Sequence, residues 1–592
     1  MQLFRVKHIF YLAVVLLFAA CTKDLKDVSD PGAYSAANYP NSMAQLKAVL
    51  GGAYSNLRTQ ALWGFEVNAH DIYLMDHTAD LGYGGDPNWS DLSRNAWNAS
   101  NGYIYRLWSA CYVGAQRVNT YLDAAEFYRK HYAHAGDSAE LTLEAGEAHF
   151  LRALYYFYLA NMFCPPVQDG NGMNTPAIPI VRKTAATLKD TYVGKSSVRE
   201  VWDYIISDLI TADQQLQKHQ WDAGNIGRVP GWAPNALLAK AYVFTGDYAR
   251  AKAVLKDIID NSGHSLMPFD IYKNMFNGDN EFNNESFYEI NIQNDFSINY
   301  GIFTGDNITA SCGLIIAPTC MNIKDTSAIA NGYGNIFVHD KNLKRFGFNL
   351  PLWKMVPNPS YDPARPAGPY NPANVCDPAY VQQSLALRQK KLVDPRLYVA
   401  ALQPWVDSVG TDSSGTVVRR IVLKYKEIPA NLKSQYYGWS LRKYGPIDNN
   451  IFAVKATDKG NVHIVRLADI YLLYAEACMR TGDNATALEY INKVHRRAYG
   501  LSPDAASAAD YKTLTDNTMA TDPVLANNPL RYERWAELFG EGQWWFDLRR
   551  WKLGEQEAAY YDNTVQGKIA WTAGSYYFPI PQLEVDNNPA LK

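Results

Sequence analysis

The chain has 592 residues, with 56 lysines and arginines against 59 aspartates and glutamates, so its formal net charge is −3. A protein with so little net charge would release few counterions from a nucleic acid on binding, which argues against a nucleic-acid partner. Apolar residues make up 47% and charged residues 19%, which argues against intrinsic disorder and allows a large core. Aromatic residues are unusually abundant, because 15 Trp, 41 Tyr and 22 Phe form 13% of the chain.

The first twenty residues have the layout of a secretory signal. Two basic residues precede an unbroken apolar run over 9–20, which is too short to cross a bilayer core that needs about 20 residues. Cys21 follows directly, and Leu-Phe-Ala-Ala-Cys resembles a bacterial lipobox. We therefore expect residues 1–20 to be a signal peptide, Cys21 to carry lipid, and residues 21–41 to form a membrane tether. A plain signal peptide beside a coincidental cysteine is the alternative.

The remaining cysteines and the acidic stretches do not indicate a cofactor. Six cysteines after Cys21 are too sparse for a disulfide scaffold and form no C-x-x-C pair, so no zinc cluster is expected. Cys312 and Cys320 are candidates for one disulfide, with two buried thiols as an equal alternative. Oxygen-bearing side chains alternate over 279–285, but Asn284 stands where an EF-hand needs glycine, so we expect a loop there.

Helices are predicted for much of the N-terminal half. Ser42, Ser138 and Ser197 are suitable N-caps, and Pro165 with Pro166 should end one of these helices. The stretch 148–159 is apolar on nearly every side, which predicts a helix surrounded by others. Apolar residues recur at three-to-four spacing in four stretches, each predicted to be an amphipathic helix: 42–58, 102–131, 138–163 and 196–217.

The chain also contains a distant internal repeat. With an offset of 236 residues, 237–251 lies over 473–487, and several alanines and a Thr-Gly-Asp turn coincide. Small alanines let two helices approach, glycine permits a left-handed turn, and aspartate caps the next helix. This pattern is typical of tetratricopeptide helix pairs. Because the copies lie far apart, we expect an irregular helical superstructure and not a regular solenoid.

The middle of the chain has a different character. Ten of the 29 prolines fall within 351–404, so helices should be largely excluded there. Short strands are predicted near 286–292 and 421–425. We therefore expect a mostly α fold made of three parts: an N-terminal helical part over 42–264, an inserted loop-rich lobe with short strands over 265–460, and a C-terminal helical part over 461–592.

Several segments lie in an order that is typical of one known family: the lipobox, Glu147–Ala153, Asn283–Ser286, Asp394–Arg396, Arg466–Ala477, Glu533–Trp551 and Phe578–Pro581. Through them the whole mature chain resembles the SusD/RagB family of outer-membrane nutrient-binding lipoproteins from Bacteroidetes. The resemblance implies a non-catalytic protein that binds an oligosaccharide or another polymer-derived nutrient at the cell surface. It also implies a partner, a TonB-dependent outer-membrane transporter of the SusC type.

The aromatic surplus provides candidates for such a ligand site. Sugars present flat C–H faces ringed by hydroxyls, so a site needs an exposed ring with Asp, Asn or Arg beside it. Three candidates, Tyr83, Trp89 and Trp97, lie in the Gly/Asn/Asp-rich loop within 60–100. For each tryptophan the alternative is a ring that folds back onto the helices as part of the core. The lobe adds three candidates of lower rank: Tyr333, Trp353 and Tyr361.

A second reading concerns the charged segment 533–550. Glu537, Glu541 and Asp547 are close enough in sequence to suggest acid–base catalysis. Because arginines and tryptophans alternate with them, we expect instead a buried ion-pair network that holds the last helix, and no enzymatic activity. Two other functions remain open. A surface glycoside hydrolase would need two carboxyls about 5 to 10 Å apart across a cleft, and a helical-repeat scaffold would bind only protein.

Overall fold

The structure is a computed structural model. It describes these residues: 39–63, 75–77, 87–93, 95–167, 171–292, 319–322, 328–330, 336–367, 371–411, 417–422, 438–445, 460–561 and 569–592. The predicted signal, Cys21 and most of the tether lie outside these ranges, as do Tyr83 and Tyr333. None of the helices in the described part combines the length and the apolar character needed to cross a membrane.

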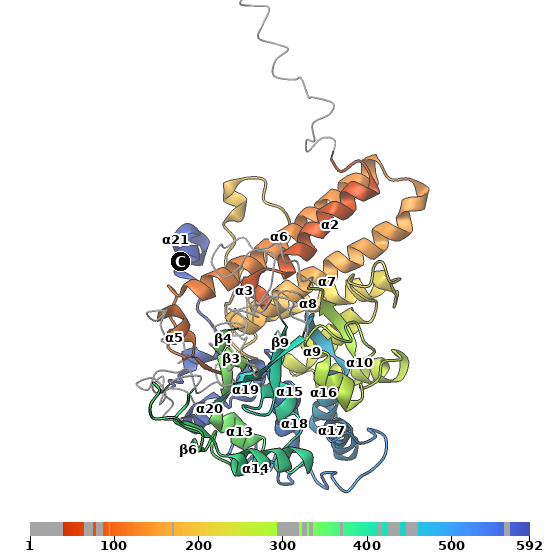
Figure 1. Cartoon of the computed structure of the whole chain (residues 1–592). Coiled ribbons are helices and arrows are strands. Elements are labelled where there is room, and N and C mark those ends of the chain that lie inside the picture. Colours follow the sequence, from red (N-terminus) through yellow and green to blue (C-terminus); the bar gives the residue numbers. More distant parts are fainter. Residues whose placement is uncertain are drawn as a thin grey trace, which may run out of the picture.

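The N-terminal helices form where the apolar periodicity predicts them. Ser42 caps the first helix by accepting a hydrogen bond from the Gln45 amide, and Ser197 forms a capping box with Glu200. Each helix packs on the next, so that they form a layered array at one end of the molecule (Figure 1). The four helices are α2 (Met43–Leu57), α6 (Gly102–His131), α7 (Ser138–Phe163) and α8 (Val198–Leu216).

One predicted cap is wrong. Ser138 does not cap α7, because the 3-10 turn η1 (Ala135–Asp137) runs directly into the helix and makes Ser138 its first residue. Asp137 stabilises that turn by accepting a hydrogen bond of 2.8 Å from the His134 amide. The other end of α7 agrees with the sequence, since the helix ends at Phe163 just before the two prolines.

The internal repeat forms two matching helix pairs, which confirms the tetratricopeptide-like prediction. The pairs are α9 (Ala233–Phe244) with α10 (Tyr248–Asn261), and α16 (Leu467–Arg480) with α17 (Asn484–Ala498). In both turns the glycine has positive φ, 79° at Gly246 and 85° at Gly482, and the following aspartate caps the next helix. Helix α10 packs against α16, so the second pair stacks on the first despite their separation in sequence.

The loop-rich lobe is inserted between these two stacked pairs. The chain leaves the first pair through β2 (Ser286–Ile290) and returns to the second through β12 (Val462–Arg466), and the two strands pair antiparallel. This confirms the strand predicted near 286–292. Because the exit and return strands are hydrogen-bonded to each other, the long insertion leaves the stacking of the helix pairs intact.

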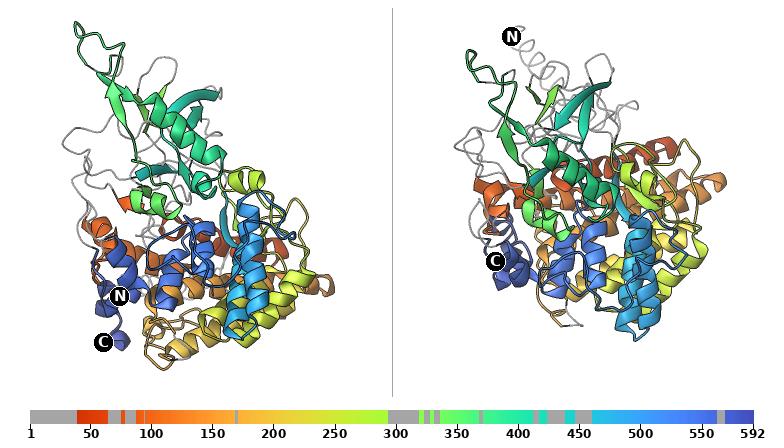
Figure 2. Two further views of the ribbon diagram at one scale, coloured as in Figure 1. Left: turned by 90° about the horizontal axis from the view of Figure 1, so that it is seen from below. Right: turned by 60° about the horizontal axis from the view of Figure 1, so that its bottom comes forward.

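Among its described residues the lobe forms a hairpin and two small sheets, one of which also includes β1 (Met75–His77) of the N-terminal part. The hairpin joins β6 (Met355–Pro357) to β7 (Asn374–Cys376) and projects away from the helices (Figure 2). One sheet has the order β1 (Met75–His77), β5 (Ile336–His339), β11 (Gly438–Leu441) and β8 (Ala401–Leu402). The other has the order β4 (Ala328–Ala330), β3 (Thr319–Asn322), β10 (Val417–Val422) and β9 (Ser408–Thr411).

The strand predicted at 421–425 begins earlier than expected, because β10 starts at Val417. Its predicted last three residues lie outside the described part of the chain.

Contrary to expectation, the proline-rich stretch contains a regular helix, α14 (Pro378–Gln389). Pro378 occupies the first position of this helix, where an amide hydrogen would have no partner in any case. The Asp377 side chain caps it by accepting from the Ala379 amide at 2.9 Å. Shorter helices of the lobe are α11 (Phe269–Asn274), α13 (Asp340–Arg345) and α15 (Leu397–Ala400).

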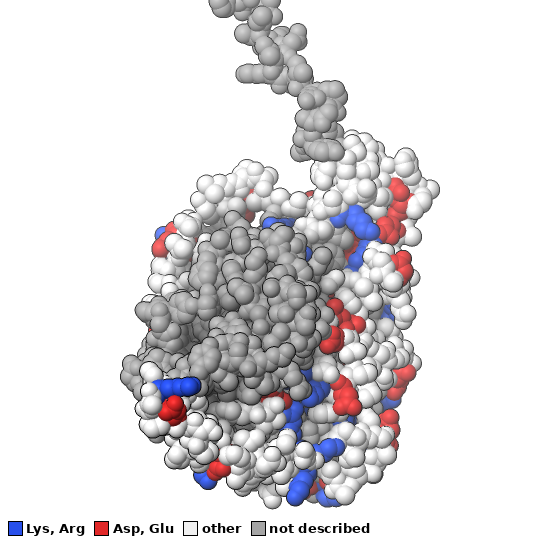
Figure 3. Space-filling model, in the orientation of Figure 1, with Lys and Arg blue, Asp and Glu red and all other residues white. Residues whose placement is uncertain are grey.

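The core lies where the inner helices meet the C-terminal segment. All twelve residues of α9 are buried, and α7 is buried on every side over 150–163, as its composition predicts. On the face shown in Figure 3 both signs of charge are interspersed over the described residues. The remaining helices are α3 (Gln60–Trp63), α5 (Pro87–Ser93), α18 (Pro529–Glu537), α19 (Trp544–Trp551), α20 (Gly554–Tyr560) and α21 (Gln582–Asn587), with 3-10 turns η2 (Leu188–Thr191), η4 (Ala573–Tyr576) and η5 (Pro589–Leu591).

Candidate functional site

The end of the predicted aromatic loop is helical and firmly held. Trp89 lies in the short helix α5 and not in a loop, because Pro87 at the first helical position favours a helix start. Asn101 caps α6 and donates a hydrogen bond of 2.8 Å to the Asn88 carbonyl, which ties α5 to the longer helix. On the other side, Asn95 donates to a carbonyl of the C-terminal segment at 2.6 Å.

Trp97 packs into the core that this C-terminal segment forms. Its ring meets Phe578 edge to face at a centroid distance of 4.9 Å, and it meets Trp545 at 6.4 Å. The residue is half-buried and borders the main apolar cluster. This is the arrangement of a ring folded back onto the helices, the alternative to a ligand contact. The sequence alone did not reveal it, because its partners lie more than 400 residues away.

Trp353 and Tyr361 lie on the projecting hairpin of the lobe. Trp353 leads into β6, Tyr361 belongs to the connection between the strands, and both side chains are half-buried. At the base of the hairpin the Tyr380 hydroxyl donates to the carbonyls of Pro351 and Leu352 at 2.6 and 2.9 Å. The base is therefore anchored to α14, which presents the two aromatic residues on a defined support.

One further residue, which the sequence did not single out, orders this hairpin. Asn371 is 8% exposed, accepts from the Asp362 amide at 2.9 Å and donates to the Asp362 carbonyl at 2.7 Å. It thereby holds the chain next to Tyr361 in a compact turn, with Arg365 exposed nearby in sequence. The available signal was the dipeptide Asn371–Pro372, which is typical of turns.

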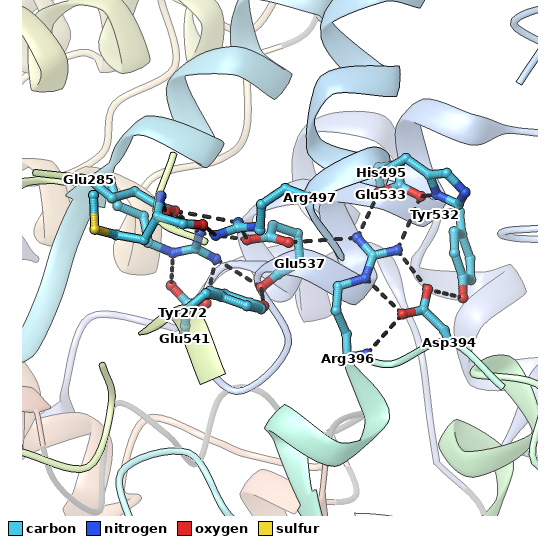
Figure 4. A network of polar contacts seen from close by, with 12 residues as sticks. Tyr272, Glu285, Asp394, Arg396, His495, Arg497, Tyr532, Glu533, Glu537 and Glu541 are labelled. Atoms are coloured by element: carbon cyan, nitrogen blue, oxygen red, sulfur yellow. Dashed lines mark hydrogen bonds and ion pairs between the residues drawn. The ribbon is translucent and has the colours of Figure 1, made fainter. Parts of the chain in front are cut away.

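The charged segment 533–550 forms a buried ion-pair network, as predicted. Its first cluster joins Arg466 and Arg497 to three carboxylates. Figure 4 shows Arg497 with these carboxylates, Glu285, Glu537 and Glu541. Arg466 lies 2.9 Å from Glu285, 2.6 Å from Glu537 and 2.7 Å from Glu541. Each arginine also contacts the ring of the buried Tyr272. This cluster connects the exit strand, the second helix pair and the C-terminal part.

A second cluster centres on Arg396 of the lobe (Figure 4). Its guanidinium lies 2.6 Å from Asp394 and 2.6 Å from Glu533, and the Glu533 carboxylate also lies 2.8 Å from His495 Nδ1. The Tyr532 hydroxyl donates to Asp394 at 2.9 Å. Lobe, repeat and C-terminal helix therefore meet in one buried polar contact.

Two carboxylates of these clusters, Glu533 and Glu541, remain ionised. Burial raises the pKa of Glu533, but Arg396 and His495 outweigh this effect and lower it to about 2. Arg466 and Lys443 likewise lower the pKa of Glu541 to about 2 against the effect of burial. A general acid requires a raised pKa and access to substrate, so the geometry is that of a structural network.

The acidic stretch 279–285 is used by protein contacts. Glu281 accepts from the Asn461 amide at 3.1 Å, Asn283 accepts from the Glu285 amide, and Glu285 pairs with the arginines. Within the described ranges, no group of three or more His, Cys, Asp or Glu side chains is placed to hold a metal ion. Cys312 and the side chain of Cys320 lie outside these ranges.

Comparisons with known proteins agree with this architecture. Residues 290–592 match the model of the SusD family, and residues 27–243 match a family described as starch-binding and associating with outer membrane. A SusD-like protein of Bacteroides ovatus is 22% identical over 96% of this chain and 87% of its own length. The starch-binding protein SusD of Bacteroides thetaiotaomicron is 24% identical over 76% of this chain and 72% of its own.

Solved structures show the same fold. A SusD-like protein of Bacteroides fragilis superposes with a TM-score of 0.65 at 17% identity, covering 94% of this chain and 98% of that one. Surface glycan-binding protein A of Bacteroides uniformis gives a TM-score of 0.62 at 20% identity, covering 93% and 99%. The mostly α fold with its inserted lobe is therefore common to these proteins.

Proposed function

The chain belongs to the SusD family, and on this premise we propose that it binds an oligosaccharide or polysaccharide nutrient at the cell surface without cleaving it. Two relatives support glycan as the ligand class, since one is named a starch-binding protein and another a surface glycan-binding protein. The absence of catalysis is part of the proposal. It is supported by the arginine-bound, ionised state of Glu533 and Glu541, which suits neither of them to act as a general acid.

The projecting hairpin is the observation that favours a sugar ligand most directly. Trp353 and Tyr361 are half-exposed aromatic rings, and the turn beside Tyr361 presents Asp362 and Arg365. Rings supply stacking surfaces and these polar groups supply hydrogen bonds to hydroxyls. We include Tyr83, Trp89 and Tyr333 among the proposed ligand contacts. Trp97 is left out, because its contacts with the core occupy part of its ring.

We further propose that ligand passes to a TonB-dependent transporter of the SusC type. The chain would be attached to the outer membrane by lipid on Cys21, which places it beside such a partner. The name of the family matched by residues 27–243 supports an outer-membrane association. Purification from native membranes in mild detergent should bring down a much larger transporter, and its consistent absence would count against this partnership.

A panel of purified polysaccharides tests the central proposal. At least one polysaccharide should retard the mature protein in affinity electrophoresis. The protein should release no reducing ends from that polysaccharide. Binding with release of reducing ends would instead identify a glycoside hydrolase. Failure to bind any member of the panel, together with recovery of a protein partner, would favour a protein-binding scaffold.

A further inference from the structure

A groove lies on the outer side of the first helix pair, away from the candidate aromatic residues in sequence. Its volume is about 490 Å³, within the range of about 300 to 1,000 Å³ that is usual for small-ligand sites. One wall is α8, with Arg199, Trp202, Asp203 and Ile206, and the other is the turn from α9 into α10, over 245–250.

The equivalent turn of the second helix pair is bridged differently. There Lys252, on the preceding helix α10, reaches across and pairs with Asp483 at 2.9 Å. In the first pair, the Asp247 carboxylate pairs with Arg250 of its own helix. Within the described residues no ion pair joins α8 to this turn, and Arg199 and Asp203 are exposed without an ion-pair partner. The turn of the second copy is therefore held by an ion pair with a neighbouring helix, whereas the turn of the first copy borders a groove.

The lining of the groove indicates the chemistry of its ligand. Arg199 and Arg250 are balanced by Asp203 and Asp247, so the site has no net charge. Guanidinium groups donate hydrogen bonds and carboxylates accept them, which together match the two roles of a sugar hydroxyl. Met173, Ile206 and Tyr248 are only partly buried and provide contact surface for C–H faces, whereas Trp202, at 4% exposure, forms the floor of the groove.

We propose that this groove is a second carbohydrate subsite, which holds a short stretch of a neutral glycan chain on the outer face of the helix pairs. The inference rests on the proposed function, because it assumes that the protein binds glycan at all. A long polysaccharide would then contact the protein at two separated places, which strengthens retention through effective concentration.

Hydrogen–deuterium exchange of the mature protein, with the tightest-binding polysaccharide from the panel as probe, tests the subsite. Glycan should slow exchange in peptides covering 199–206 and 245–252. The equivalent turn at 481–488 is an internal control and should be unaffected. Arg199→Ala/Asp203→Ala should remove this protection and weaken binding of short oligosaccharides to the groove at least tenfold, since hydrogen bonds to charged groups are lost.

Two further variants make the test specific. Ala249→Trp, at an exposed position in the groove, should block the subsite without removing any charge. Lys256→Ala/Asp260→Ala removes an exposed pair of opposite charges elsewhere on α10 and should bind like the wild type.

The outcomes separate the two proposals. The subsite would be overturned if the protein binds polysaccharide without protection at 245–252 and both groove variants bind as tightly as the wild type. The proposed function would then still stand. Failure of the wild type to bind any glycan would overturn the proposed function and the subsite with it.

Discussion

Glu144 allows a quantitative test of how a buried carboxyl without a cationic partner affects this fold. It lies on α7 with 0% exposure, and its Oε2 accepts a hydrogen bond of 3.0 Å from the Tyr121 hydroxyl. Its other oxygen, Oε1, has no hydrogen-bond partner. The neighbouring cation, Arg228, is instead paired with Glu140 and Glu147. Burial therefore opposes the ionisation of Glu144, and the hydrogen bond from Tyr121 offsets this effect only in part.

Burial raises the pKa of Glu144 to about 7 from its ordinary value of 4.5, and repulsion by Glu140 adds to this effect. The folded protein thus holds a proton that the unfolded chain releases between about pH 4.5 and 7. The contribution to stability is fully present below pH 4.5 and is lost as the pH rises to about 7. The loss reaches about 3 kcal/mol, because one pKa unit corresponds to about 1.36 kcal/mol.

Glu144→Gln should remove this pH dependence. Glutamine has the same shape, retains an acceptor oxygen for Tyr121 and stays neutral at every pH. With an unfolding entropy of about 2.1 cal/mol/K per residue over 592 residues, about 3 kcal/mol corresponds to a shift in melting temperature of roughly 2–3 °C. The variant should melt with the wild type at pH 4.5 and roughly 2–3 °C above it at pH 8.

Differential scanning calorimetry across this pH range measures the difference directly. Glu126→Gln, which alters an exposed carboxylate on the neighbouring helix α6, is the matched control and should follow the wild type at every pH. A melting difference for Glu144→Gln that stays constant from pH 4.5 to 8 would refute the reasoning, as would a variant that is less stable than the wild type at pH 8.

Four further predictions concern the ligand site, the anchor and the buried network. Trp353→Ala and Tyr361→Ala should each weaken glycan binding by about 1 to 3 kcal/mol in calorimetric titration, roughly 5- to 150-fold, with unchanged melting temperature. Trp97→Ala should lower stability by about 2 to 4 kcal/mol and leave the affinity of the folded protein unchanged, because its ring packs on the core. Cys21→Ala should release the protein from outer-membrane fractions, and mass spectrometry should find an acyl group on the wild type alone. Glu537→Gln should cost about 3 to 5 kcal/mol of unfolding free energy, since two buried arginines lose their shared carboxylate, and an unchanged denaturation midpoint would contradict this.

Where the deciding interactions are local, the sequence was sufficient. The helices over 42–58 and 102–131 follow from apolar spacing, and Ser197 with Glu200 marks the start of α8 within one turn. The two Thr-Gly-Asp turns could also be predicted from the sequence, because glycine at positive φ and an aspartate cap act over only a few residues.

Local rules also explain two differences from the prediction, one in the proline-rich lobe and one at the start of α7. Proline breaks a helix in its interior, but Pro378 stands at the first position of α14, where a helix accepts it. Serine is a suitable cap by residue type, but the 3-10 turn η1 runs directly into α7 and makes Ser138 the first helical residue. In both places the residue is common near the start of a helix, and its exact position relative to the first helical residue decides its effect.

Only the tertiary structure decided which distant segments meet. The sequence indicated that 533–550 is an ion-pair network, but Arg396 and Glu533 are 137 residues apart, and no spacing rule relates them. Likewise, no spacing rule predicts that the ring of Trp97 meets Phe578, which lies more than 400 residues away in the sequence. Helix propensity and capping depend on neighbours in the chain. The burial of a ring or a charge depends on contacts that exist only once the insertion has closed through β2 and β12 and brought its two ends together.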